Sequence, residues 1–152
     1  MKSLWSAIVL AAVLMPGVPR LARTQGNRWE RQVSGQLQRA VAALRGKGVG
    51  RPDLTRIAPL NSEESESFPV TLQAGVAYYI SGACDNDCTS LHLVLANAAN
   101  NEVATDRSSE NYPVLRFTPP ETVRYRVKVT MAACQMNPCW YGVAVYRKAL
   151  SP

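Results

Sequence analysis

The feature that most constrains the fold is a succession of short segments, rich in β-branched and aromatic residues, that fills residues 68–147. Turn residues separate these segments, among them Ala74-Gly75 and Pro119-Pro120. Short strands with close turns and no alternating helices predict a mainly β protein. We expect an antiparallel, jelly-roll-like β-sandwich of about seven to eight strands. The segments are 68–73, 76–81, 91–96, 102–105, 114–118, 124–131 and 140–147.

Alternation of apolar and polar residues indicates which strand faces are buried. Leu91, Leu93 and Leu95 share one face of an expected strand, and His92 and Val94 share the other. Further along, another expected strand has apolar residues at every second position and basic residues between them. It should therefore have one buried face and one basic face. The apolar residues are Val123, Tyr125, Val127 and Val129, and the basic residues are Arg124, Arg126 and Lys128.

An amphipathic helix is expected to precede the sandwich, beginning at Asn27. Six apolar residues at helical spacing form a stripe about 120° wide, with four arginines on the opposite side. The glycines of 46–50 and the following Pro52 should end the helix. Such a stripe packs on its own domain or lies on an anionic membrane surface; its modest size favours packing. The apolar residues are Trp29, Val33, Leu37, Ala40, Val41 and Leu44, and the arginines are Arg28, Arg31, Arg39 and Arg45.

The start of the chain has the pattern of a secretory signal peptide. Lys2 precedes an uncharged apolar run of twelve residues, 4–15, and the Pro and Gly residues of 16–19 end that run. As a helix the run would span about 18 Å, too short for the roughly 30 Å hydrocarbon core of a bilayer. Cleavage is expected after Ala22 or after Gly26. We therefore expect a secreted or periplasmic protein.

Charge divides the chain into a basic N-terminal part and a slightly acidic remainder. Residues 1–60 carry ten Lys and Arg against two acidic residues, whereas residues 61–152 carry seven against nine. The acidic stretch 61–67 (NSEESES) is the expected boundary. Three parts follow from these features: a signal peptide in 1–26, a basic helix and linker in 27–60, and the sandwich domain from 61 to 152.

Four cysteines form two close pairs, Cys84 with Cys88 and Cys134 with Cys139. Such spacings suit either a zinc site of four thiolates or two disulfides in an exported domain. The signal-like start favours disulfides, because an oxidising compartment preserves them. Four cysteines allow three pairings, and we expect each to bond to its near neighbour. Each bridge would then close a short loop and contribute roughly 2 kcal/mol to stability.

Seven stretches of the chain match the pattern of a known domain family. They are FPVTLQAG (68–75), YYISG (78–82), CDNDC (84–88), SLHLVL (90–95), PVLRFTP (113–119), RYRVKV (124–129) and CWYGVAV (139–145). Together they resemble the bacterial pre-peptidase C-terminal domain family, the small sandwiches similar to bacterial collagen-binding domains. The resemblance covers about 80 of the 152 residues and consists mostly of core and turn positions. One departure concerns a family strand with the pattern Asp-Leu-Asp-Leu, whose acidic positions correspond here to Ser90 and His92.

The resemblance implies a secreted accessory module. Domains of this family accompany proteases and other exported enzymes, or stand alone. They bind surfaces or polymers or assist secretion, and some bind calcium. No catalytic domain accompanies the sandwich in this chain, which is therefore expected to be a free-standing version.

Calcium is the one cofactor that the local chemistry suggests. Asp85 and Asp87 supply carboxylate oxygens within one tight loop, and Ca²⁺ takes six to eight oxygen ligands. Aspartate and asparagine are also ordinary turn formers, because their side chains bond nearby backbone groups. The loop is therefore either a calcium site or a structural turn.

No catalytic motif is apparent in the sequence. His92 is the single histidine, and no G-x-S-x-G nucleophile motif surrounds it. The glycines of 46–50 lack the preceding strand and following helix of a phosphate-binding loop. We therefore expect that the protein is not an enzyme.

The sequence as a whole favours a secreted, non-catalytic β-sandwich accessory or binding module stabilised by two disulfides. Its partner would be a polymer or protein surface outside the cell or in the envelope. The alternative is an envelope-associated protein that docks on anionic lipid or polymer through its basic segment 28–56. Nucleic acid is not an expected partner, because exported proteins seldom meet it. The candidate binding residues are Arg124, Arg126, Lys128 and Tyr112.

Overall fold

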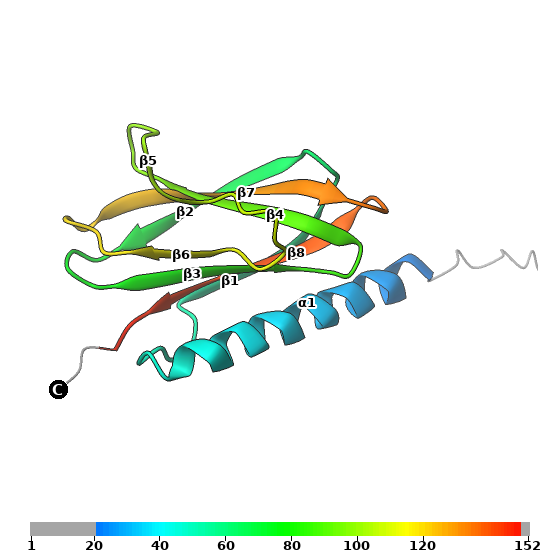
Figure 1. The fold of residues 1–152 in the computed structure, drawn as a ribbon, viewed down its shortest axis with the longest axis horizontal. Helices are drawn as coiled ribbons and strands as arrows, with labels where there is room; N and C mark the ends of the chain where they lie inside the picture. Colours follow the sequence, from blue (N-terminus) through cyan, green and yellow to red (C-terminus); the bar gives the residue numbers. More distant parts are fainter. Residues whose placement is uncertain (1–20, 150–152) are drawn as a thin grey trace, which may run out of the picture.

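The structure, a computed structural model, describes residues 21–149, with side chains from Arg28 onward. One helix is followed by eight strands (Figure 1). The expected apolar run 4–15 and the breakers that follow it lie outside the described residues. The elements are α1 (Leu21–Arg45), β1 (Leu54–Leu60), β2 (Ser65–Leu72), β3 (Tyr78–Cys84), β4 (Cys88–Ala96), β5 (Glu102–Asp106), β6 (Val114–Phe117), β7 (Val123–Cys134) and β8 (Cys139–Arg147).

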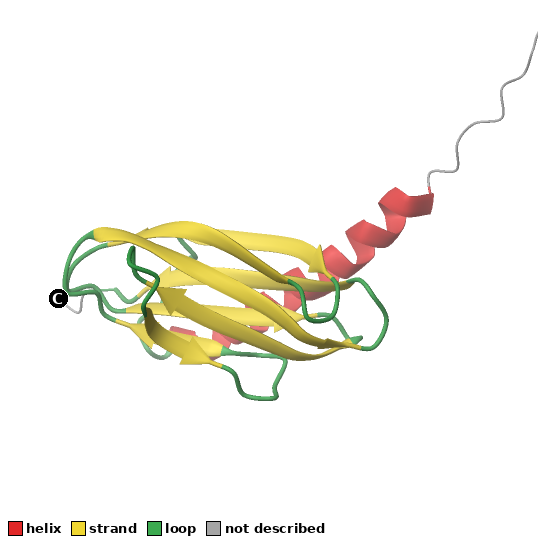
Figure 2. Cartoon of the chain, turned by 90° about the horizontal axis from the view of Figure 1, so that it is seen from above, coloured by secondary structure: helices red, strands yellow, loops and turns green. Residues whose placement is uncertain are grey.

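The strands form two four-stranded antiparallel sheets that pack face to face as a β-sandwich (Figure 1), which Figure 2 shows from above. The first sheet has the order β1-β8-β3-β6 and the second has the order β2-β7-β4-β5. The mainly β, antiparallel sandwich expected from the sequence is thereby confirmed. We refer to the first as the helix-covered sheet and to the second as the open sheet.

The core lies between the two sheets and is built from the alternating apolar residues. In β4, Leu91, Leu93 and Leu95 are fully buried. In β7, Val127 and Val129 are fully buried, whereas the basic residues between the apolar ones are exposed. The alternation in both segments thus has the predicted consequence.

The helix α1 packs across the outer face of the helix-covered sheet (Figure 1). Val33, Leu37 and Leu44 are buried there, while the four arginines of the opposite side are exposed. The helix comes so close to the sheet that the position beneath it requires a glycine. A Cβ added at Gly142 would lie 2.6 Å from Val33 Cγ1. The apolar stripe is therefore occupied by the sandwich in this structure. Over residues 21–149, no helix combines the length and apolarity that a bilayer span requires.

Three boundaries differ from those predicted. The helix begins at Leu21 instead of Asn27, so both expected cleavage sites lie within it. Residues 54–60, expected in the linker, form the edge strand β1. This strand was not predicted because it contains Pro59 and lacks a regular alternation of buried and exposed residues. The expected boundary stretch 61–67 contributes the start of β2. Its Glu66 is accommodated because the carboxylate pairs with Arg56.

Candidate functional site

The outer face of the open sheet carries a row of basic side chains. Arg124, Arg126 and Lys128 point outward from β7, and all three are exposed. Successive outward residues on a strand lie about 7 Å apart, so the row of three extends over about 14 Å. We call these three residues the basic row.

The residues that β2 and β4 place beside the basic row are not acidic, so they do not neutralise its positive charge. On β2, the residues paired with Arg124, Arg126 and Lys128 are Thr71, Pro69 and Ser67, and on β4 Val94 and Ala96 flank the row. None of these positions carries a carboxylate. The outward positions of β2 and β7 therefore combine positive charge with the hydroxyl groups of Ser67 and Thr71, and β4 adds the apolar side chains of Val94 and Ala96. Such a surface attracts extended anions.

One end of the basic row borders a shallow hollow of about 370 Å³. The hollow lies between Pro69 of β2 and the loop that joins β4 to β5. Arg126 Nη1 donates a hydrogen bond to Asn100 Oδ1 of that loop at 2.5 Å. The guanidinium is therefore held over the hollow, where its remaining N–H groups can donate to an anionic oxygen.

Tyr112, the fourth candidate, does not join the basic row. Its side chain is 44% exposed, and together with Val114 it faces α1 across a pocket. The row occupies the open sheet, whereas Val114 starts an edge strand of the helix-covered sheet. The structure therefore separates Tyr112 from the three basic candidates, because the β5–β6 connection crosses from one sheet to the other.

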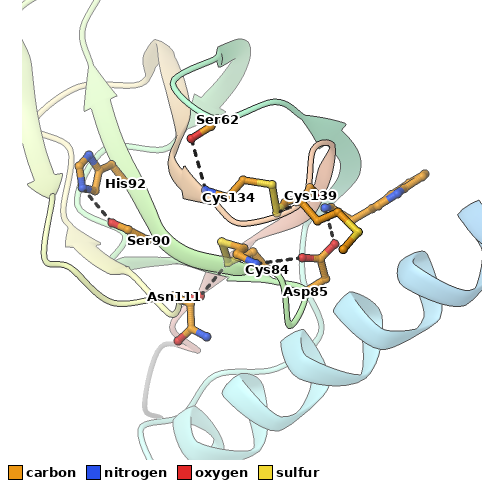
Figure 3. Close-up of a disulfide and its surroundings, with 11 residues drawn as sticks. Ser62, Cys84, Asp85, Ser90, His92, Asn111, Cys134 and Cys139 are labelled. Atoms are coloured by element: carbon orange, nitrogen blue, oxygen red, sulfur yellow. Dashed lines mark hydrogen bonds between the residues drawn. A yellow bond between two sulfur atoms is a disulfide. The ribbon is translucent and has the colours of Figure 1, made fainter.

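Both cysteine pairs form the expected disulfides, Cys84–Cys88 and Cys134–Cys139 (Figure 3). Each bridge joins the helix-covered sheet to the open sheet, since it links β3 to β4 or β7 to β8. Cys88 and Cys134 are direct partners in the β4–β7 register. The two bridges thus pin one end of the sandwich, which we call the cystine end. With all four thiols bonded, no thiolate remains for zinc.

Asp85 acts as a structural acceptor at the cystine end (Figure 3). It is 1% exposed, and its carboxylate accepts the backbone N–H of Trp140 at 2.7 Å and that of Cys88 at 3.2 Å. Burial raises the pKa of the Asp85 carboxyl above its ordinary 3.8, although these two N–H donors act to lower it. Both carboxylate oxygens thus bind the backbone.

In the described residues, the structure does not assemble a set of calcium ligands around Asp85 and Asp87. Asp87 is half-buried, and its backbone oxygen accepts the N–H of Gln135. Among residues 21–149, no three His, Cys, Asp or Glu side chains converge as metal ligands would. Calcium binding by Asp85 and Asp87 stays a prediction from the sequence.

Replacing Asp85 by asparagine is expected to change how stability depends on pH. Because the folded-state pKa of Asp85 is raised, its contribution to stability is full below about pH 3.8 and is lost as the pH rises through that pKa. Asparagine does not titrate. The free energy of unfolding of Asp85→Asn, measured in urea from pH 3.5 to 7, should therefore improve relative to the native protein as the pH rises.

Asp106 provides a control of opposite sign. Burial raises its pKa, but hydrogen bonds from the Val114 N–H and from Ser108 outweigh burial, so the pKa lies below 3.8. Its contribution is present above the unfolded pKa and is lost as the pH falls. Asp106→Asn should thus lose stability relative to the native protein as the pH rises. Parallel slopes for the two variants would contradict the assigned environments.

His92 has no catalytic partners in the described part of the chain. Its Nε2 lies 3.4 Å from Ser90 Oγ on the same strand, a long contact. The nearby Asp106 directs its two oxygens to Val114 and Ser108. No hydrogen bond joins His92 to a carboxylate within residues 21–149, so the serine, histidine and aspartate do not form a triad.

Two further features have no signal in the sequence. Glu66 accepts a hydrogen bond from the Tyr141 hydroxyl at 2.5 Å, in addition to its ion pair with Arg56. Met136 is 70% exposed in the loop closed by Cys134–Cys139. Both depend on contacts or exposure that are set by the packing of distant strands.

Comparison with known proteins establishes the fold. No protein-family model and no curated protein matches the sequence. Among solved structures, the pre-peptidase C-terminal domain of a Bacillus anthracis collagenase matches with a TM-score of 0.50 and 15% identity, covering 63% of this chain and 90% of that domain. The Aeromonas hydrophila protein PliG, a periplasmic inhibitor of g-type lysozyme, matches with a TM-score of 0.47 and 10% identity, covering 64% and 88%. The first match confirms the resemblance expected from the sequence at the level of fold.

Proposed function

We propose that this protein is an exported, non-catalytic binding module that attaches to anionic polymers or surfaces through the basic row of its open sheet. The observation that best supports this proposal is that the two outer faces of the sandwich differ. One outer face is covered by α1, and the other presents Arg124, Arg126 and Lys128 without a neutralising carboxylate among their paired neighbours.

Two features support export and the role of a module. Two disulfides pin the cystine end, and such bridges persist in oxidising compartments outside the cytoplasm. The signal-like composition of residues 1–26 agrees with this. The fold is shared with a domain of a collagenase, which supports the proposal of an accessory module.

The second candidate is docking through the basic N-terminal segment 28–56. The arginines on the free side of α1 are exposed, which favours contact with an anionic surface. The apolar side of α1, however, packs on the helix-covered sheet. Insertion of that side into a membrane would require α1 to leave the sandwich, so we place this candidate second.

Removing the basic row is expected to weaken binding to a polyanion. The triple variant Arg124→Ala/Arg126→Ala/Lys128→Ala should bind immobilised dextran sulfate about tenfold or more weakly than the native protein. The plot of log affinity against log salt concentration should also become less steep, by about 2 to 3 in slope. Each cation that contacts the polyanion displaces about one counterion, so the variant with three fewer cations displaces about three fewer. Elution from dextran sulfate in a salt gradient, with neutral dextran as reference, measures both effects.

A helix variant with the same loss of charge is the matched control. Arg28→Ala/Arg31→Ala/Arg45→Ala removes three exposed cations from α1. It should elute close to the native protein if the basic row is the binding surface. If this variant loses binding and the sheet variant keeps it, the helix candidate replaces the one proposed. Unchanged elution of both variants would reject both.

A further inference from the structure

A groove of about 320 Å³ runs between α1 and the edge strand β6, on a side of the molecule that the basic row does not reach. Two of the three large apolar side chains that are exposed among the described residues lie in it: Tyr112, 44% exposed, and Val114, 43% exposed. The helix side contributes Ala40, Ala43 and Leu44. The groove walls are thus mostly apolar.

The wall of the groove also holds a buried polar group without a partner. Gln36 is 4% exposed, and no donor in the described structure reaches its side-chain oxygen Oε1. Buried polar atoms are nearly always hydrogen-bonded in native proteins. This oxygen has almost no exposed surface, so an N–H donor of a ligand reaches it once the Gln36 side chain rotates toward the groove.

The edge of β6 offers further backbone groups. Gly82 donates its N–H to Pro113 O, and Leu115 pairs with Ile80, so the odd-numbered residues of β6 bond to β3. Val114 and Arg116 therefore direct their backbone groups away from the sheet. Asp106 already accepts the Val114 N–H, which leaves Arg116 as the position where an added strand can pair.

The charged residues around the groove indicate which kind of peptide would bind there. Arg39 lines it, and Arg116 lies on the helix side of the sheet, with its guanidinium 5.9 Å from the Tyr79 ring. Of the nearby acids, Asp106 is bonded to Val114 and Ser108, and Glu110 is exposed in the preceding loop. Arg39 in the groove wall and Arg116 on the same side of the sheet favour an acidic partner. A second copy of this chain would bring the same arginines together, which disfavours self-association through this edge.

We propose that the groove between α1 and β6 binds an extended acidic peptide segment of a partner protein, with one apolar side chain inserted between Tyr112 and Leu44. Backbone N–H groups of the segment supply the missing donor for Gln36 and pair with the edge of β6. The acidic residues lie against Arg39 and Arg116. This inference is independent of the basic row.

Selection of peptides tests the proposal. Random linear octapeptides displayed on phage are selected against the intact, disulfide-bonded protein, and the enriched peptides are synthesised and titrated. They should share acidic residues around one large apolar residue. Val114→Glu and Arg39→Glu should each weaken their binding at least tenfold. Gln36→Leu should weaken binding while raising the melting temperature, a combination that a purely structural role of Gln36 does not produce.

Met136→Glu is the matched control, because it places a charge at the third exposed apolar side chain, in a loop at the cystine end. It should leave peptide affinity unchanged. The proposal is wrong if no peptide is enriched, or if enriched peptides bind Val114→Glu and Arg39→Glu as tightly as the native protein. It is also wrong if binding is lost only with the triple variant of the basic row, or if the variants change only self-association.

Discussion

Loss of both disulfides is expected to lower the free energy of unfolding by about 4 kcal/mol and the melting temperature by about 15 °C. The bridges close short loops, with sequence separations of 4 and 5 residues. In the chain-entropy model each loop contributes roughly 2 kcal/mol, and neither loop contains the other, so their contributions add. Both bridges also hold the two sheets together at the same end. Urea unfolding of the native and fully reduced protein measures the difference.

Alanine variants of single bridges separate the two contributions. The Cys84→Ala/Cys88→Ala variant and the Cys134→Ala/Cys139→Ala variant should each lose about half of the total. Reductant should destabilise each of them only by the remaining half. A total loss below about 1 kcal/mol would contradict the assignment of the cystine end as a main source of stability.

Replacing Gly142 by valine is expected to destabilise the protein by about 3 kcal/mol. A Cβ at this position would lie 2.6 Å from Val33 Cγ1 and 2.8 Å from Leu37 Cδ1, both closer than real Cβ contacts. Two further methyl groups must then displace the helix, and overpacking of this kind costs about 1–3 kcal/mol before helix contacts are lost. Thermal unfolding followed by circular dichroism should show a melting temperature lower by about 10 °C.

A second glycine, on the helix itself, serves as the control. At Gly35 an added Cβ would meet only the end of the Arg39 side chain, at 3.8 Å. Glycine inside a helix is about 1 kcal/mol less favourable than alanine. Gly35→Ala should therefore raise the melting temperature by a few degrees. Equal melting temperatures for Gly142→Val and the native protein would show that α1 does not rest on the sheet as described.

The sequence predicted strands best where only one face is buried. In β7 the outward Arg and Lys residues alternate with buried Tyr and Val, and the period of two is unmistakable. β1 was missed because it is an edge strand that contains a proline and has no fully buried residue. β3 is buried along its whole length, since α1 covers its outer side, and it shows no alternation. Coverage by a helix is a tertiary property that local pattern does not contain.

For the candidate residues, the sequence predicted which are exposed and which form disulfides, but not which of them lie together. The close spacing of the cysteines indicated the disulfides, and the alternation of apolar and basic residues indicated the basic row. Whether Tyr112 lies beside that row depends on which sheet receives β6, and the sequence carries no such information. Asp85 has the residue type and loop position of a calcium ligand, and its structural role is evident only from its burial and its hydrogen bond from the Trp140 N–H. Gln36 lies in the predicted helix, but its unpaired oxygen results from packing against other elements.

The proposed function requires that the open sheet, and not the helix, contacts the anionic partner. We would follow the amide chemical shifts of the ¹⁵N-labelled, disulfide-bonded protein during titration with a short sulfated dextran oligosaccharide. If the open sheet is the binding surface, the shift changes concentrate in β7 and in the adjoining β2 and β4, and α1 is unaffected. Shift changes concentrated in α1, with β7 unchanged, would rule out the open sheet as the binding surface.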